Sequence, residues 1–212
     1  MNLEDMRRNY AARSLDLTDL NADPLVQFDH WMREAIESQM LEPNAMSLAT
    51  ANETGQPSLR TVLIKGFDHC GLVFFTNYSS AKARDIKTNP RVALMFTWLP
   101  LERQVVITGA AAKITTAESL KYFLSRPRDS QIGAWASRQS EVISTRSVLE
   151  TKFAEMKAKF VRGEVPLPDH WGGYRVVPET IEFWQGRPNR IHDRFRYRKE
   201  SDANWTIERL MP

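Results

Sequence analysis

The chain contains a series of strand-like segments that follow one another without helices between them, and this feature most constrains its fold. Apolar and β-branched residues mark segments 45–51, 59–67 and 72–77, and turn-forming residues separate them. Two longer segments of the same kind follow at 91–98 and 103–114. Strands joined by short turns pair antiparallel, whereas parallel strands need a helical crossover. The pattern therefore predicts an α+β, mainly β fold, a mainly antiparallel barrel with attached helices, and not a doubly wound sheet.

Helix signals are few and lie around the predicted strands. Asp23-Pro24 predicts a helix start, because an acidic N-cap is followed by proline at the first helical position. A short helix is predicted at 80–88, and capping-box spacing opens another at 115–124. We expect a loop at 125–130 and a longer helix at 144–160.

The C-terminal part returns to the strand pattern. Glycine and proline favour a loop over 163–173. We then expect separate strands at 174–177, 180–185, 190–198 and 205–210.

The length of 212 residues suits one domain with a core of its own. Residues 1–22 are polar and mixed in charge, and we expect them to form an N-terminal arm that becomes ordered against a partner or ligand. We expect residues 23–212 to form a single domain, because no repeat or linker interrupts them.

Charge and cysteine content exclude several classes of protein. The sequence has 29 Lys and Arg against 26 Asp and Glu, and a surplus of +3 does not favour nucleic-acid binding. Cys70 is the only cysteine, which rules out an internal disulfide and predicts the reducing cytoplasm. The four histidines lack metal-ligand spacing, and no apolar segment has the length of a membrane span. We therefore expect no metal, no nucleic acid and no membrane among the partners.

A phosphate ligand would have to be bound by side chains, because the sequence has neither a glycine-rich dinucleotide motif nor a P-loop. On a strand, alternate residues share a face, so the 190–198 segment would carry five basic side chains on one face. These are Arg190, His192, Arg194, Arg196 and Arg198. Such a face requires acids or an anionic ligand opposite it. Periodicity leaves both readings open, an anion site or a solvated face neutralised by a neighbouring strand. The distal end of the segment, Arg196 and Arg198, favours plain surface.

Other basic residues give weaker signals. Arg60 and Lys65 point to opposite faces of a flat strand, so one ligand touches both only if the strand bends or the ligand spans the strand's edge. The loop 125–130, with Tyr122 one turn earlier, is either an anion clamp or a surface turn. Lys82 alone favours plain surface.

Two more side chains have two readings each. Gln104 interrupts an apolar strand and binds a ligand or faces solvent, and Trp184 alone is typical of a core. We found no arrangement of nucleophile and base, so the chemistry would fall to a phosphorylated cofactor.

Taken together, several motifs resemble the pyridoxine/pyridoxamine 5′-phosphate oxidase family, the FMN-binding split barrels. The resemblance extends over nearly the whole chain, from about Arg7 to Pro212. The motifs are Arg60–Lys65 (RTVLIK), Glu102–Val105 (ERQV), Ser125–Trp135 (SRPRDSQIGAW), Pro166–Pro168 (PLP), Trp171–Arg175 (WGGYR), Ile181–Gly186 (IEFWQG) and Arg190–Arg194 (RIHDR).

The resemblance implies a split β-barrel homodimer with FMN at the subunit interface. The positions that match FMN contacts of the family are Arg60, Thr61, Val62, Leu63, Ile64, Lys65, Phe75, Thr76, Lys82, Gln104, Gln139, Ser140, Trp184 and Arg194. Those that match contacts to the phosphorylated vitamer are Lys65, Tyr122, Arg126, Ser130, Arg190 and His192, with Arg190 and His192 as the catalytic pair. The arm positions Arg7, Arg8, Asn9 and Tyr10 match a segment that closes over the substrate.

The resemblance also implies the reaction. Pyridoxine or pyridoxamine 5′-phosphate is oxidised with dioxygen to pyridoxal 5′-phosphate and hydrogen peroxide, by hydride transfer to the flavin, and the amine releases ammonia. The alternatives are a related split-barrel flavoprotein with another substrate, or a carrier of FMN or pyridoxal phosphate. A nucleic-acid module built on the 190–198 segment is a further alternative, which the small net charge disfavours.

Two positions depart from the family pattern. Ala81 stands where the family usually has an arginine, and Asn9 stands where an acidic residue is usual. The first departure predicts weaker binding of the FMN phosphate, unless Arg84 or another group compensates.

Overall fold

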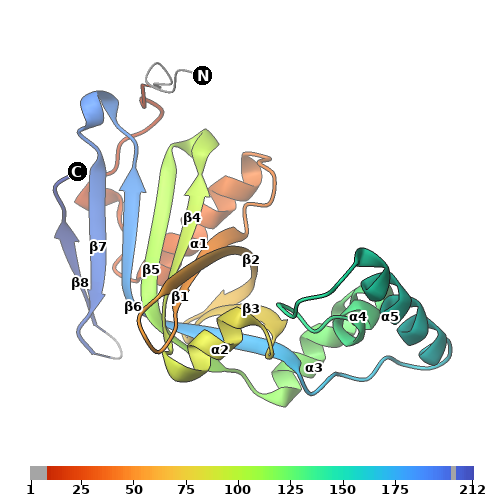
Figure 1. Cartoon of the computed structure of the whole chain (residues 1–212). Coiled ribbons are helices and arrows are strands. Elements are labelled where there is room, and N and C mark those ends of the chain that lie inside the picture. Colours follow the sequence, from red (N-terminus) through yellow and green to blue (C-terminus); the bar gives the residue numbers. More distant parts are fainter. Residues whose placement is uncertain (1–8, 202–203) are drawn as a thin grey trace.

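A computed structural model describes residues 9–201 and 204–212, and its centre is a closed antiparallel barrel (Figure 1). Six strands form the barrel in the order β3-β2-β1-β4-β5-β6, and β6 closes it by pairing with β3. The strands are β1 (Ala45–Ala51), β2 (Pro57–Asp68), β3 (Gly71–Asn77), β4 (Arg91–Trp98), β5 (Arg103–Lys113) and β6 (Trp171–Gln185). The predicted antiparallel barrel is confirmed.

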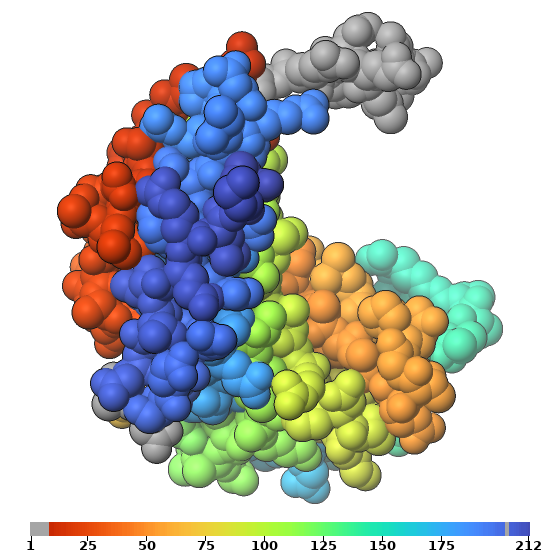
Figure 2. Space-filling view, turned by 90° about the vertical axis from the view of Figure 1, so that its left-hand side faces the viewer, coloured from red at the N-terminus to blue at the C-terminus, as the bar shows by residue number. Residues whose placement is uncertain are grey.

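Two more strands extend the sheet beyond the barrel. β7 (Asp193–Lys199) pairs with the end of β6, and β8 (Trp205–Arg209) pairs with β7. Figure 2 shows the N-terminal part of the chain, in red, lying along these C-terminal strands, in blue. The Tyr197 hydroxyl on β7 donates a hydrogen bond to the carbonyl of Asn21, 2.7 Å away.

Five α-helices lie in the described part of the chain. They are α1 (Pro24–Glu37), α2 (Ala81–Thr88), α3 (Thr116–Ser125), α4 (Arg128–Ala136) and α5 (Arg146–Lys159). Helix α1 starts as predicted, because the Asp23 side chain accepts a hydrogen bond from the Leu25 amide. None of these helices is long and apolar enough to cross a lipid bilayer.

The apolar residues form two separate cores. The larger core fills the barrel and is covered by α1, whose Trp31 packs edge-on against Phe183 of β6 at 5.0 Å. The smaller core joins α3 and α4 to the start of β6 through Phe123, Ile132 and Trp171. This second core packs α3 and α4 against the start of β6.

The structure differs from the sequence-based prediction at three places. Segments 174–177 and 180–185 belong to one strand, β6, which continues through a bulge at Glu179 and starts at Trp171 inside the predicted loop. The predicted loop 125–130 is wrong from Arg128 onward, where α4 begins directly after Pro127.

The third difference concerns the predicted strand 190–198. It begins only at Asp193, because Asn189 and Arg190 both have left-handed backbone angles, with φ of 59° and 63°. Left-handed residues cannot continue a strand, so Arg190 and His192 lie in a turn.

Candidate functional site

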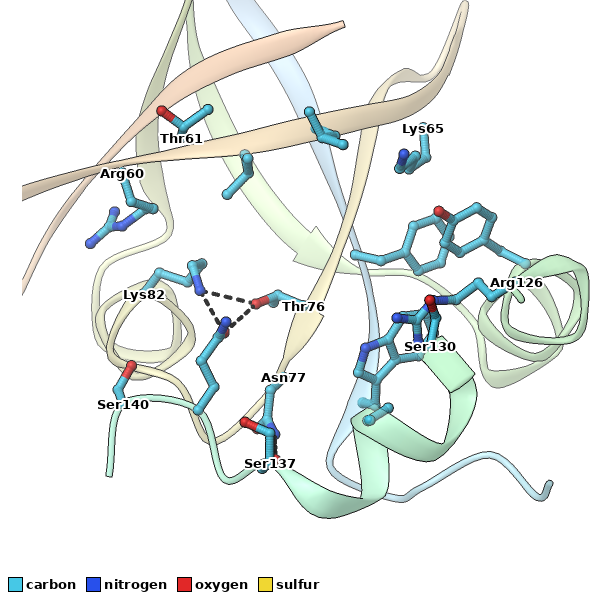
Figure 3. A pocket seen from close by; sticks show the side chains of 18 of the residues that line it. Arg60, Thr61, Lys65, Thr76, Asn77, Lys82, Arg126, Ser130, Ser137 and Ser140 are labelled. Carbon is cyan, nitrogen blue, oxygen red and sulfur yellow. Dashed lines mark hydrogen bonds between the residues drawn. The ribbon is translucent and has the colours of Figure 1, made fainter. Parts of the chain in front are cut away.

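A cavity of about 690 Å³ opens between the barrel wall and the α3–α4 region (Figure 3). Residues from β2, β3 and α2 form one side of it, and residues from α3, α4 and the start of β6 form the other. Its lining residues are Arg60, Thr61, Val62, Leu63, Lys65, Phe75, Thr76, Asn77, Ala81, Lys82, Tyr122, Arg126, Ser130, Gly133, Ala134, Ser137, Gln139, Ser140 and Trp171.

Lys82 and Arg60 form a first cationic group in this cavity. Lys82, on α2, is buried, and its ammonium donates hydrogen bonds to Gln139 Oε1 at 2.8 Å and Thr76 Oγ1 at 3.1 Å. Burial, with a smaller contribution from the nearby Arg60 charge, lowers the pKa of Lys82 to about 8. A buried ammonium with only neutral acceptors around it is a binding group for an anion.

Hydroxyl groups of the barrel wall orient the Arg60 guanidinium. Its Nη1 donates to Thr50 Oγ1 at 2.8 Å, and its Nη2 donates to Ser58 Oγ at 2.5 Å. Asp85 of α2 accepts hydrogen bonds from both hydroxyls. Burial lowers the pKa of Arg60, and Asp85 partly opposes this, so the guanidinium is fixed and remains charged.

A second cationic group lies on the other side of the cavity, where Figure 3 shows Arg126, Ser130 and Lys65 apart from Arg60 and Lys82. The Arg126 guanidinium stacks on Trp171 at 4.7 Å. Its Nη1 is buried and has no hydrogen-bond partner among residues 9–201 and 204–212. Burial lowers the pKa of Arg126, partly offset by Tyr122. A buried N–H without an acceptor is costly, so this geometry favours an anionic ligand at Arg126.

Lys65 reaches the cavity because β2 contains a bulge. Ile64 pairs with Phe74 of β3 and Gly66 pairs with Val73, which leaves Lys65 as the extra residue. A bulge changes the direction of the strand and of its side chains. Arg60 and Lys65 therefore line the same cavity, and the sequence-based condition that the strand must bend is met.

None of the described residues that line the cavity is acidic, although four of them are basic. The two cationic groups lie at different places along it, and a stack of aromatic rings stands beside the second group, with Phe75 and Tyr122 at 3.9 Å. This arrangement fits two small anionic groups and a planar ring system better than one long polyanion.

The remaining predicted site residues occupy other places. Ile64 is buried in the barrel core and does not line the cavity. Arg7 and Arg8 lie outside the described residues, and Asn9 is exposed at the start of the described chain. The others gather around the far end of β6, and they are Tyr10, Gln104, Trp184, Arg190, His192 and Arg194.

Three rings form the centre of this second group, which we call the ring cluster (Tyr10, Trp184 and His192). Trp184 and His192 lie 4.6 Å apart, and Tyr10 stands edge-on to Trp184 at 5.8 Å and to His192 at 5.9 Å. The amide of Arg187 donates a hydrogen bond to His192 Nδ1 at 3.1 Å. The neutral imidazole therefore carries its proton on Nε2, which makes Nε2 a hydrogen-bond donor.

The cavity and the ring cluster are far apart within one chain. Trp171 lines the cavity and Trp184 belongs to the ring cluster, yet both lie on β6, 13 residues apart. At ~3.3 Å per residue this corresponds to roughly 40 Å along the strand. One small ligand cannot touch both groups of a single chain.

The basic face predicted for 190–198 is neutralised over β7. Arg194 donates to Glu182 Oε1 at 2.8 Å, and Arg196 donates to Glu208 Oε2 at 2.7 Å. Arg198 also pairs with Glu208. Of the two readings, the solvated face with acids on a neighbouring strand is correct for Arg196 and Arg198, which we call the β7 arginine row. Arg194 pairs with Glu182 but stays a predicted cofactor contact.

Some lining residues were missed by sequence reasoning. Gly133, Ala134 and Ser137 were missed because α4, which carries them to the cavity, was not predicted. Asn77 was missed although its side chain donates to the Ser137 carbonyl and closes this wall. Trp171 lies in a motif that carried the family resemblance, but it was not predicted as a site residue.

The fold and the cavity define this chain as an antiparallel barrel that binds small anionic ligands beside an aromatic wall. A family model described as "Pyridoxamine 5'-phosphate oxidase" matches residues 32–160. A second model, described as "Pyridoxine 5'-phosphate oxidase C-terminal dimerisation region", matches residues 171–212. The chain belongs to the pyridoxine/pyridoxamine 5′-phosphate oxidase family.

Relatives and solved structures agree with this assignment. The chain is 61% identical to the pyridoxine/pyridoxamine 5′-phosphate oxidase of Rippkaea orientalis over 100% of both chains. It is 55% identical to that of Escherichia coli, over 98% of this chain and 94% of the relative. The crystal structure of PhzG from Burkholderia lata, in complex with tetrahydrophenazine-1-carboxylic acid, superposes with a TM-score of 0.87 at 28% identity, covering 92% and 95% of the two chains.

Proposed function

We propose that this chain is an FMN-dependent oxidase of pyridoxine 5′-phosphate and pyridoxamine 5′-phosphate. The products are pyridoxal 5′-phosphate and hydrogen peroxide, and the amine substrate also takes up water and releases ammonia. The observation that carries the proposal is the cavity with two separated cationic groups and no acidic lining residue. Cofactor and substrate each carry one phosphate, which matches this distribution. The relatives at 55–61% identity bear the name of this oxidase.

The first cationic group fits the phosphate of FMN. Lys82 and Arg60 supply the charge, and Thr76, Gln139 and Ser140 supply polar atoms around it. Thr61, Val62 and Leu63 line the cavity between the two cationic groups, where the flavin ring would lie along β2. When bound, FMN accepts a hydride from the substrate and is reoxidised by dioxygen.

The second cationic group fits the phosphate of the substrate. Arg126 offers a buried N–H that needs an acceptor, and Lys65, Tyr122 and Ser130 lie around the same part of the cavity. Binding a phosphate here would satisfy Arg126 and fix one end of the vitamer. Fixing the phosphate contributes to catalysis by orientation, because it holds the reacting carbon of the vitamer at a constant position relative to the flavin.

The ring cluster would serve the site of a second copy of the chain. Arg190 and His192 cannot reach the cavity of their own chain, yet both lie within the matched dimerisation region. We propose that the homodimer brings this turn to the cavity of the partner, with Gln104, Trp184 and Arg194 beside the cofactor. In that position the Nε2–H of His192 and the Arg190 guanidinium would hold the pyridine ring of the substrate.

The organisation of the chain is proposed as an N-terminal arm over residues 1–22 and one domain over 23–212. The exposed free thiol of Cys70 supports a location in the reducing cytoplasm.

One experiment tests the proposed function. The purified protein is supplied with FMN, its visible spectrum is recorded, and pyridoxamine 5′-phosphate is added under air. We expect a bound-flavin spectrum, peroxide and an aldehyde product in equal amounts. Flavin binding without product would favour the carrier, and no flavin binding would overturn the proposal.

A further inference from the structure

Glu102 is a buried carboxylate that belongs to neither of the two cationic groups. It lies between a short 3-10 turn (Leu99–Leu101) and β5, in the left-handed conformation with φ of 55°, and is only 5% exposed. Its Oε2 accepts hydrogen bonds from two consecutive backbone amides of the N-terminal arm, Ala11 at 2.9 Å and Ala12 at 3.0 Å. Two N–H groups on one buried carboxylate oxygen are a strong attachment for a segment without helix or strand.

The backbone of Glu102 holds the loop that follows β6. Its carbonyl accepts a hydrogen bond from the Gly186 amide at 2.7 Å. Gly186 has no side chain, and a Cβ there would come within 2.8 Å of Tyr10 Cγ and 3.1 Å of Glu102 Cβ. Tyr10 therefore packs directly on the backbone of this loop. One residue fixes both the arm and the surface on which the arm lies.

The attachment lies directly beside Tyr10 in the sequence. Leu15 is held at a second point, where its amide donates to Asp193 Oδ2 at 3.1 Å, and Arg13 pairs with Glu34 of α1 at 2.5 Å. Among the described residues, however, only the contacts to Glu102 involve the backbone directly after Tyr10. The ring of Tyr10 in turn touches Trp184 and His192.

We propose that Glu102 is a positioning residue that attaches the arm and so places Tyr10 against His192 and Trp184. It acts through Tyr10 and touches neither ligand. The inference rests on the proposed function in one respect, since His192 is taken to hold the substrate.

Backbone hydrogen exchange tests the attachment without any turnover. The variants are Glu102→Ala, which removes the acceptor, and Glu102→Gln, which keeps an acceptor oxygen at the same place. Glu179→Ala is the matched control, because this exposed glutamate pairs with Arg91 far from the arm. In Glu102→Ala we expect the amides of Ala11 and Ala12 to exchange about tenfold faster. Glu102→Gln and the control should stay within about twofold of the parent chain. Unchanged exchange in Glu102→Ala would overturn the proposal.

Kinetics test whether the attachment acts through Tyr10. We expect Glu102→Ala to raise the KM for pyridoxamine 5′-phosphate about tenfold, while FMN affinity and Tm change little. In the Tyr10→Ala background the same substitution should add almost nothing, because the attached ring is already absent. Fully additive effects would overturn the positioning role. An increase in the Kd for FMN as large as the increase in KM would overturn it too. A parent chain without oxidase activity would instead contradict the proposed function, and the exchange data would still stand.

Discussion

The cavity and the β7 arginine row contain the same kind of side chain in opposite electrostatic situations. On β7, Arg196 and Arg198 both pair with the carboxylate of Glu208 on the adjacent strand β8, at 2.7 Å and 3.2 Å. In the cavity, Arg126 has a buried N–H without a partner in the described part of the chain, and none of the described lining residues is acidic.

The difference shows that arginine density does not identify an anion site. Strand register places Glu208 directly opposite Arg196, and this pairing is set by β8, more than ten residues later. A row of arginines with acids on the next strand is a solvated surface, whereas a smaller group without acids is a binding site. We expect substitutions in the two regions to differ by orders of magnitude.

The largest effect is expected for Arg126→Ala. It removes the buried donor proposed for the substrate phosphate, worth roughly 3 kcal/mol and hence about 100-fold in kcat/KM for pyridoxamine 5′-phosphate. FMN binding should be preserved, since Lys82 and Arg60 lie at the other end of the cavity. Steady-state kinetics with a flavin titration check both parts. Equal loss of FMN affinity would show that the two cationic groups are not separate sites.

Mixing two inactive variants tests whether the site is shared between copies. Arg126→Ala and Arg190→Ala are each expected to have little turnover. After subunit exchange, a mixed dimer has one site with both arginines intact, so an equal mixture should recover about a quarter of the parent activity. If mass spectrometry confirms subunit exchange and no activity returns, the proposed sharing is wrong. Either both arginines then serve the site of their own subunit, or Arg190 lies outside the site.

A smaller, pH-dependent effect is expected at Lys82. Its pKa of about 8 means that the free ammonium loses its proton above that pH. When FMN is titrated into the FMN-free protein, we expect the Kd for FMN to rise roughly tenfold between pH 7 and pH 9.5. We expect Lys82→Arg to abolish this rise, because arginine stays protonated over the whole range. Flavin fluorescence quenching measures both. A pH-independent Kd in the parent chain would contradict the placement of FMN phosphate at Lys82.

The folding stability of the FMN-free protein should rise with pH, whereas its affinity for FMN falls. The folded pKa of Lys82 lies below its ordinary value of 10.5, so the unfolded chain binds the extra proton between about pH 8 and pH 10.5. Stability without FMN should therefore rise across this range, and the burial of the charge should cost stability below pH 8. Lys82→Met should raise Tm at pH 7 and remove the rise, as denaturation at several pH values will show.

The smallest effect is expected for Arg196→Ala in the β7 arginine row. The side chains of Arg196 and Glu208 are 40% and 34% exposed, so water screens the pair and it contributes little to stability. Activity and FMN affinity should stay within about twofold of the parent chain, and salt should reduce even the small loss of stability. A large loss of turnover would show that Arg196 belongs to the functional site, and would contradict the distinction drawn between the β7 arginine row and the cavity.

Much of the fold was predictable because local signals were consistent. The bounds of β1 and β4 agree with the predicted segments, since turn residues end these strands on both sides. The start of α1 was predictable because Asp23 caps it and Pro24 follows. The helix α4 was not, since the Arg-Pro-Arg segment before it is typical of a loop and no side chain caps its start.

The site was only partly predictable for a related reason. Most of the residues that line the cavity were predicted from the family motifs. The bulge at Lys65 was not predictable, because it follows from the pairing of β2 with β3 and no local sequence pattern marks it. The turn at Arg190 was missed because its alternating pattern looks like a strand, whereas two left-handed residues interrupt it.

The sequence alone determined which side chains exist to bind anions, the antiparallel barrel and the family, because these depend on residue types and on periodicity along the chain. Only the tertiary structure decided which basic residues are neutralised and which stay free for a ligand. It also separated the cavity from the ring cluster by the length of β6 and tied the arm to Glu102. These outcomes depend on contacts between residues far apart in the sequence, and charge interactions are decided by the few ångströms that such contacts set.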